Sequence, residues 1–267
     1  MESINNIERF KQRIREGHVC VGTCISLSDS AVSELVAEAG YDFTWIDSEH
    51  GPLDLLTILG HIMALRGTNT APFVRVRCND VNIIKPILDL VPAAIIVPLV
   101  RSGQDVLEAV QACKYPPVGV RGYGPRRGQH FGRISMEEYL ETANDQTMVL
   151  VQIEHFEAVK NLDEILAVPG LDGVCLGPND LSGSMGKLGQ ITDKEVAAVI
   201  DTVIDKARRS GLFLGVAGGY DPKTLPVWLE KGIQWIALNT DWSNMFAHSK
   251  IVVDAVRECE LKRSSKS

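Results

Sequence analysis

Short apolar runs alternate along the chain with longer stretches in which apolar residues recur every three or four positions. The short runs are rich in β-branched and aromatic residues, which is typical of buried strands. They lie at 18–26, 42–47, 72–77, 93–100, 148–154, 173–177, 212–218 and 234–240. The longer stretches predict helices at 30–40, 55–67, 81–90, 104–114, 156–168, 194–211 and 222–232. Eight strands alternating with helices predict an α/β fold, a single-domain (β/α)8 TIM barrel.

A doubly wound open sheet is the alternative architecture. No GxGxxG motif follows the first strand, and the nearest pattern, GVRGYG at 119–124, lies in a loop that opens no clear helix. The barrel is therefore the favoured fold.

The predicted barrel is not interrupted by a linker. We expect an N-terminal helix over 1–17, the barrel over 18–259 and a flexible tail over 260–267. One long irregular stretch, 115–135, is rich in Gly, Pro and Arg and precedes the fifth strand. That position is opposite the usual active-site loops of a barrel, so this stretch either crosses the barrel or meets a neighbouring subunit.

Composition and charge exclude several kinds of partner. Hydrophobic residues make up 45% of the chain and charged residues 23%, which are ordinary globular values. The net charge of −7 disfavours nucleic acid or an acidic membrane as the main partner. The N-terminus has no apolar signal core, and the most apolar run, 91–100, is too short to span a bilayer. The six cysteines show no CxxC spacing, which favours reduced core thiols in a cytoplasmic protein.

Polar side chains gather where four of the predicted strands end, which is where barrel enzymes place catalytic groups. They are Asp47, Glu49 and His50 after the second strand, Arg75 and Arg77 on the third, Gln152, Glu154 and His155 on the fifth, and Asn179, Asp180 and Ser182 after the sixth. Oxygen ligands such as Glu154 and Asp180 suit a hard divalent cation.

Each of these residues also has an ordinary structural explanation. Asp180 or Ser182 could cap the helix after the sixth strand, and His155 could begin the helix after the fifth. His50 could lie in a solvated loop, and Arg75 could pair with a structural carboxylate. The residues alone indicate a barrel enzyme with a metal-dependent site.

Several segments together resemble one family. The segments WIDSEHGPLD, the Arg of PFVRV, KPILDL, YPPVGVRGYG, VQIE and DGVCLGPNDLSGSMG occur in the order and spacing of the HpcH/HpaI aldolases. These are metal-dependent pyruvate aldolases, which include the 4-hydroxy-2-oxoheptanedioate and 2-dehydro-3-deoxyglucarate aldolases. The resemblance covers roughly residues 18–255.

The resemblance implies a role for each matching residue. Glu154 and Asp180 match the metal-binding carboxylates, with Mg²⁺, Mn²⁺ or Co²⁺ as the cation. The catalytic positions are His50, Arg75, Asp47 and Asp89, of which Asp89 partners the histidine and could come from a neighbouring subunit. The substrate-binding positions are Gln152, Gly177, Pro178, Asn179 and Ser182.

The activity implied is the reversible aldol cleavage of a 4-hydroxy-2-oxo acid to pyruvate and an aldehyde through a metal-stabilised enolate. The alternatives are oxaloacetate decarboxylation, a biosynthetic synthase that uses the same enolate, and a non-catalytic binding barrel. A Schiff-base mechanism is disfavoured because the lysines fall in predicted helices and loops. The resemblance also implies a homohexamer, a trimer of dimers, with the apolar C-terminal helix packed or exchanged between subunits. The sequence does not name the aldehyde, and Arg121, Arg126, Arg127 and Arg133 are either cations for an acidic substrate tail or interface residues.

Overall fold

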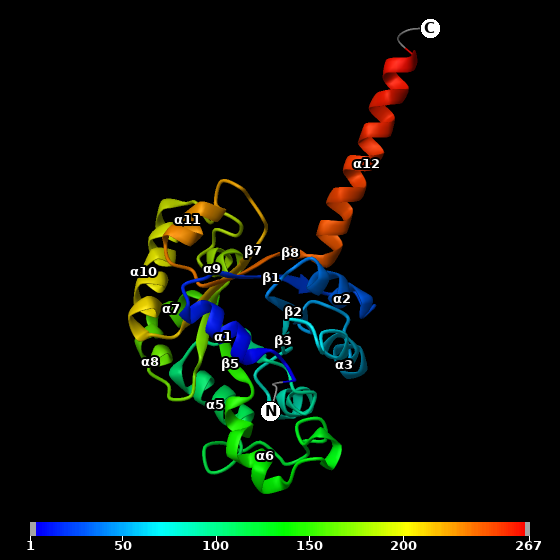
Figure 1. Cartoon of the computed structure of the whole chain (residues 1–267). Helices are drawn as coiled ribbons and strands as arrows, with labels where there is room; N and C mark the ends of the chain where they lie inside the picture. The colour runs from blue at the N-terminus through cyan, green and yellow to red at the C-terminus, as the bar shows by residue number, and fades with distance from the viewer. Residues whose placement is uncertain (1–3, 265–267) are drawn as a thin grey trace.

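A closed barrel of eight parallel strands forms the centre of the computed structural model, which describes residues 4–264 (Figure 1). The strands are β1 (Cys20–Ile25), β2 (Phe43–Asp47), β3 (Ala71–Arg75), β4 (Ala94–Val97), β5 (Met148–Ile153), β6 (Gly173–Leu176), β7 (Phe213–Gly218) and β8 (Trp235–Thr240). Each pairs with the next, and β8 pairs with β1, so the predicted (β/α)8 barrel is confirmed and the open sheet is excluded.

Helices surround the barrel. They are α1 (Ile7–Arg15), α2 (Ala31–Glu38), α3 (Leu55–Ala64), α4 (Val81–Leu88), α5 (Gly103–Cys113), α6 (Met136–Thr142), α7 (Phe156–Lys160), α8 (Leu162–Leu166), α9 (Pro178–Ser184), α10 (Lys194–Ser210), α11 (Leu225–Glu230) and α12 (Asp241–Ser264). The helix predicted over 156–168 is two helices, because the backbone leaves helical geometry at Asn161. The irregular stretch leads into a short 3₁₀ turn, His130–Gly132, and into α6, which apolar spacing did not indicate.

Alternation along each strand divides the core into an inner and an outer layer. On β3, Ala71 and Phe73 belong to the cluster inside the barrel, whereas Val74 and Val76 belong to the cluster under the helices. Successive side chains of a strand point to opposite faces. The next inward position on β3 is therefore Arg75, at the carboxyl end of the strand.

The N-terminal helix closes the opposite end of the barrel. Ile7, Phe10 and Ile14 share one face of α1 and are buried. The Phe10 ring lies 4.8 Å from that of Phe73 and 5.8 Å from that of Phe43, both edge-on. These aromatic contacts close the amino-terminal end of the barrel interior.

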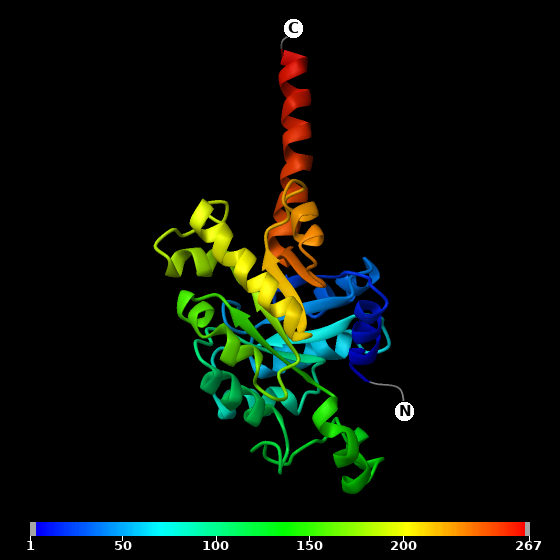
Figure 2. The same cartoon turned by 90° about the vertical axis from the view of Figure 1, so that its left-hand side faces the viewer.

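The C-terminal helix α12 projects from the barrel as a long rod (Figures 1 and 2). Its first residue, Asp241, is its one buried residue, and it accepts hydrogen bonds from the backbone N–H groups of Ser26 and Leu27. The helix continues through 260–264, so the tail expected from 260 begins inside a helix, and 265–267 lie outside the described residues.

Cys20 and Cys24 lie in β1, as expected, and all six cysteines are free thiols.

Among residues 4–264, no helix has both the length and the apolar character needed to cross a bilayer.

Candidate active site

Three polar side chains form the innermost contacts at the carboxyl ends of the strands. Asp47 and Arg75 are directly paired in register on β2 and β3. The Arg75 guanidinium donates to both carboxylate oxygens of Asp47, from Nε at 2.9 Å and from Nη2 at 2.6 Å. Its Nη1 donates to Gln152 Oε1 across the barrel at 3.2 Å. A bidentate pair of this kind fixes the orientation of the guanidinium.

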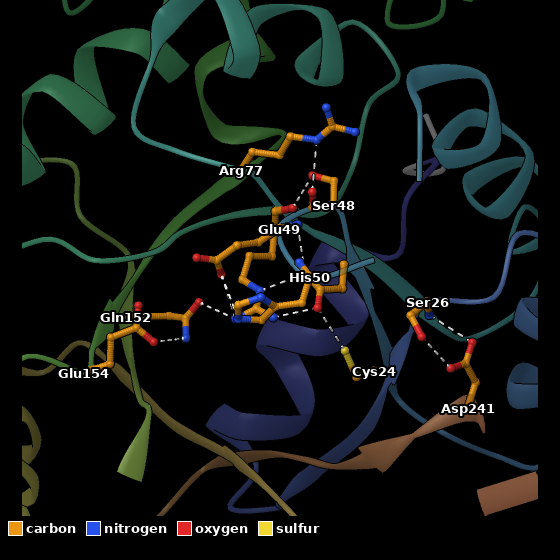
Figure 3. A network of polar contacts seen from close by, with 11 residues as sticks. Cys24, Ser26, Ser48, Glu49, His50, Arg77, Gln152, Glu154 and Asp241 are labelled. Atoms are coloured by element: carbon orange, nitrogen blue, oxygen red, sulfur yellow. Dashed lines mark hydrogen bonds and ion pairs between the residues drawn. The ribbon is translucent and has the colours of Figure 1, made fainter. Parts of the chain in front are cut away.

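Glu154 follows Gln152 on the same side of β5 and extends the network. Gln152 donates through Nε2 to Glu154 Oε2 at 2.7 Å (Figure 3). The Leu99 backbone N–H donates to Glu154 Oε1 at 2.8 Å. Gly177, after β6, leaves room for this carboxylate, because a Cβ there would lie 2.8 Å from Glu154 Cβ. The missing side chain at Gly177 is therefore part of the shape of the site.

Four carboxylates, those of Asp47, Glu49, Glu154 and Asp180, act on one another at this end of the barrel. Burial raises the pKa of Glu154 to about 7, and the charges of Glu49 and Asp180 contribute to the rise. Burial also raises the pKa of Glu49, and Asp47 and Asp180 act in the same direction. The positive charge of Arg75 opposes both shifts.

Glu49 also lies in this site, although the family resemblance implies no role for it. Its Oε2 lies 2.9 Å from Arg75 Nη1, without the geometry of a hydrogen bond. Glu49 is among the polar residues expected after the second strand, and it lies two residues beyond Asp47, as alternation requires of a residue on the same side.

His50 stands at the rim. Its Nε2 lies 4.0 Å from Glu49 Oε2, and its side chain is 71% exposed. The Asp47 carboxylate accepts the backbone N–H groups of both Glu49 and His50, so the same acid that orients Arg75 also shapes the histidine loop. His50 is therefore open to a ligand that enters from the mouth.

The remaining residues predicted to bind substrate or metal lie in the segment after β6. Gly177 and Pro178 are buried at the start of α9, whereas Asn179 and Asp180 are exposed in its first turn. Ser182 is fully buried, and its hydroxyl donates to the Asn179 carbonyl and accepts the Gly189 N–H. Its hydroxyl therefore stabilises the loop after α9, and its predicted contact with a substrate stays a prediction.

Two further positions have clear local roles. His155 caps α7, where its ring Nδ1 accepts the Glu157 N–H. Asp89 ends α4 at the opposite rim of the barrel from His50, and it pairs with Arg121 at 3.1 Å. One chain alone therefore does not bring Asp89 to His50.

The donor set fits a hard divalent cation. Glu154 and Asp180 offer carboxylate oxygens, and the pKa of Glu154 is raised first by burial and then by neighbouring negative charge, which a cation would neutralise. Among residues 4–264, no three His, Cys, Asp or Glu side chains gather as a metal cluster. If Glu154 and Asp180 held a cation, water and substrate oxygens could fill its other positions.

Comparison with known proteins agrees with this architecture. The chain is 38% identical to a hydroxypyruvate/pyruvate aldolase of Pseudomonas aeruginosa, over 89% of this chain and 88% of the relative. It is 40% identical to a 4-hydroxy-2-oxo-heptane-1,7-dioate aldolase of Escherichia coli, over 87% of this chain and 88% of the relative.

Solved structures and a family model extend the comparison. An HpcH/HpaI aldolase/citrate lyase family protein of Burkholderia cenocepacia J2315 superposes with a TM-score of 0.86 at 29% identity, covering 93% of this chain and 99% of that one. Citrate synthase SbnG superposes with a TM-score of 0.84 at 28% identity, covering 94% and 98%. The model of the HpcH/HpaI aldolase/citrate lyase family matches residues 22–244. On these grounds the chain belongs to the HpcH/HpaI aldolase/citrate lyase family.

Proposed function

We propose that this protein is a metal-dependent carbon–carbon lyase that cleaves a 4-hydroxy-2-oxo acid to pyruvate and an aldehyde. The observation that carries the proposal is the hydrogen-bonded Asp47–Arg75–Gln152–Glu154 network. It fixes a guanidinium at the carboxyl ends of the strands, beside the proposed oxygen ligands Glu154 and Asp180. The names of the relatives, a hydroxypyruvate/pyruvate aldolase and a 4-hydroxy-2-oxo-heptane-1,7-dioate aldolase, support the same chemistry.

The reaction requires stabilisation of the electron pair that the broken C3–C4 bond leaves behind. When a base removes the proton of the C4 hydroxyl, the C3–C4 bond breaks, the aldehyde leaves, and the electrons remain on the pyruvate half as an enolate. Protonation at C3 then gives pyruvate. Arg75 is a fixed cation beside the oxygen on which the charge develops, and such preorganised donors stabilise the transition state.

Glu154 and Asp180 are the residues that would hold a divalent cation. When bound, Mg²⁺, Mn²⁺ or Co²⁺ supplies a Lewis acid for the 2-oxo acid oxygens. Gln152 keeps the Glu154 carboxylate in place, and the exposed first turn of α9 at Asn179 offers backbone N–H groups to a substrate carboxylate. His50 is the exposed base that takes the C4 hydroxyl proton, directly or through water.

The proposal is tested first on the pyruvate half alone. Wild-type protein with Mg²⁺ or Mn²⁺ should exchange the C3 hydrogens of pyruvate for deuterium in D2O, followed by proton NMR. Excess chelator should stop the exchange. Glu154→Gln should lose it, whereas Asp163→Asn, a surface acid paired with Lys206, should keep it.

Two results would contradict the proposal. One is full exchange in excess chelator, and the other is a pyruvate adduct trapped on a lysine by borohydride. A metal-supplemented screen of pyruvate with many aldehydes, read by product mass, then finds the second substrate.

A synthase is the second candidate. Citrate synthase SbnG shares the fold at a TM-score of 0.84 and 28% identity over nearly the whole chain, and the same enolate serves carbon–carbon bond formation. Oxaloacetate decarboxylation reaches that enolate by loss of CO₂. Turnover of oxaloacetate alone, compared with pyruvate plus aldehydes, separates these activities.

Helix α12 has a large exposed apolar surface. The rod α12 exposes Trp242, Met245, Phe246, Ile251, Val252, Val253, Val256 and Leu261. Apolar surface on this scale is typical of an interface. We therefore propose a homohexamer, a trimer of dimers, in which α12 packs on or exchanges with a neighbouring subunit and Asp89 reaches the neighbour's His50. A monomer at every concentration in sedimentation velocity would refute both statements.

A further inference from the structure

The pyruvate half of the substrate needs a proton donor at C3. In the proposed cleavage, C3 takes a proton after the C3–C4 bond breaks, whereas His50 has just taken a proton from the C4 hydroxyl. Transfer of a proton to or from carbon is accelerated by a side chain positioned to give or accept it. The four carboxylates at this end of the barrel are the acids within reach of Arg75, and they differ in the hydrogen bonds that they already accept.

Glu49 is the carboxylate of this group with a buried oxygen left free. Both oxygens of Asp47 accept hydrogen bonds from Arg75, and both oxygens of Glu154 also accept hydrogen bonds. Asp180 is exposed and is the other proposed metal ligand. Within the part of the chain that the structure describes, Glu49 Oε2 is buried and accepts no hydrogen bond. Because such an oxygen is costly to leave without a donor, it indicates a hydrogen that another group brings.

The Glu49 carboxylate lies between Arg75 and the proposed base. Its Oε2 is 2.9 Å from Arg75 Nη1 and 4.0 Å from His50 Nε2, and Figure 3 shows Glu49 and His50 side by side. A hydrogen bond requires about 2.7–3.2 Å, and the His50 ring, which is 71% exposed, can turn to close the difference. Arg75 is the proposed partner of the substrate oxygen on which charge develops, and C3 is two bonds away from that oxygen. Glu49 is therefore close to C3 on one side and to the base on the other.

The surroundings of Glu49 favour a carboxyl group that holds a proton. Burial raises its pKa, and the positive charge of Arg75 opposes this rise. The negative charges of Asp47 and Asp180 add to it. Proton transfer is most effective from a group whose pKa lies near the working pH. The side chain is 14% exposed, so part of it remains open to a ligand.

We infer that Glu49 is a catalytic residue that gives a proton to C3 of the enolate and receives one from His50. The inference rests on the proposed lyase function. In cleavage, His50 takes the C4 hydroxyl proton, the C3–C4 bond breaks, its electron pair passes to the enolate, and the C4 oxygen becomes the aldehyde carbonyl. C3 then takes the proton of Glu49, and His50 returns its own proton to Glu49. The proton of the hydroxyl thus replaces the one given to C3, and no further reactant is needed.

The test compares two reactions that share the enolate. Exchange of the pyruvate C3 hydrogens in D2O requires proton transfer at C3, whereas release of CO₂ from oxaloacetate does not. Both rates are measured with Mg²⁺ present. Glu49→Gln should lower the ratio of exchange to CO₂ release by about 10²- to 10⁴-fold, as expected for the loss of a general acid or base. Glu49→Asp, which keeps the carboxyl group, should recover part of this ratio.

The order in which the products appear is a second readout. An enolate that is not protonated on the protein leaves as enolpyruvate and is protonated in solution. In Glu49→Gln, pyruvate should therefore appear with a delay after CO₂, and in the wild type the two should appear together. A role of Glu49 confined to the structure of the site would produce no such delay.

Glu157→Gln is the matched control, because it removes an exposed acid of α7, and it should leave the ratio unchanged. Three results would overturn the inference. Equal losses of exchange and CO₂ release in Glu49→Gln would mean that Glu49 only supports Arg75. A loss of Mn²⁺ affinity in calorimetry as large as that of Glu154→Gln would make Glu49 a metal ligand. Exchange that is lost in His50→Ala but kept in Glu49→Gln would assign the C3 proton to His50.

Failure of the underlying function looks different from failure of the inference. Wild-type protein that neither exchanges pyruvate hydrogens nor releases CO₂ from oxaloacetate would refute the lyase itself. Wild-type protein that does both, with a ratio unaffected by Glu49→Gln, would refute the role of Glu49 alone.

Discussion

The substitution Gly177→Ala tests whether the space beside Glu154 is needed for function. The added Cβ would lie 2.8 Å from Glu154 Cβ and 3.0 Å from its Oε2. The first distance is about 1 Å short of the optimal 3.5–4.0 Å between carbon atoms. Because Glu154 Cβ is fixed to the backbone of the strand end, the strain cannot be relieved by rotating a side chain, and the carboxylate must move.

Two magnitudes follow from this displacement. Overpacking of this kind costs about 1–3 kcal/mol, which for a chain of this size lowers Tm by about 2–12 °C. A reacting group misplaced by about 1 Å loses about 10²-fold in rate. Gly177→Ala should therefore remain folded at 25 °C yet exchange pyruvate hydrogens about a hundredfold more slowly, with weaker Mn²⁺ binding in calorimetry.

The matched control is Gly218→Ala, at the end of β7, where an added Cβ meets nothing within 4 Å. It should keep the exchange rate and Mn²⁺ affinity of the wild type. Wild-type exchange and Mn²⁺ affinity in Gly177→Ala would show that the Glu154 carboxylate does not need its present position, and the proposed ligand role would fail.

Three further substitutions examine other parts of the chain. Arg75→Ala should slow aldol cleavage and oxaloacetate decarboxylation alike by about 10²–10³; a loss confined to one reaction would argue against a shared enolate. His50→Ala should slow aldol cleavage by about 10²–10⁴ and decarboxylation less, because loss of CO₂ requires no base for a C4 hydroxyl; equal losses in a coupled assay would make His50 a structural residue. Burial lowers the pKa of His61, whose ring nitrogens lie 2.9 Å from Ser33 Oγ and 3.0 Å from the Leu27 carbonyl. The unfolded chain then binds a proton at higher pH than the folded one, so stability should fall as the pH drops below about 6.5, and His61→Gln should flatten the fall of Tm between pH 7 and pH 5.

The strand positions were predictable because alternation and barrel geometry act locally. Arg75, Gln152 and Glu154 lie at strand ends, and a period of two residues carries each of them inward from the apolar core. The rule ends with the regular strand, because Arg77, two residues beyond Arg75, lies past the end of β3 and is exposed. Sequence patterns report the direction of a side chain well when a regular strand determines it.

Other positions depended on contacts between distant segments. Ser182 was expected to meet the substrate, but its hydroxyl is used by Asn179 and Gly189 in the turn that follows. Asp89 pairs with Arg121, which comes from the irregular stretch that follows α5. No local pattern encodes which of several possible partners a hydroxyl or a carboxylate takes.

The helix that closes the barrel from below has a consequence for biosynthesis. Phe10 leaves the ribosome early, yet it packs against Phe43, Phe73 and, at 6.5 Å, Phe213. The last of these belongs to β7, some two hundred residues later in the chain. The aromatic contacts of α1 are therefore complete only once β7 is in place, so its docking couples the first helix to the closure of the barrel over a long stretch of sequence.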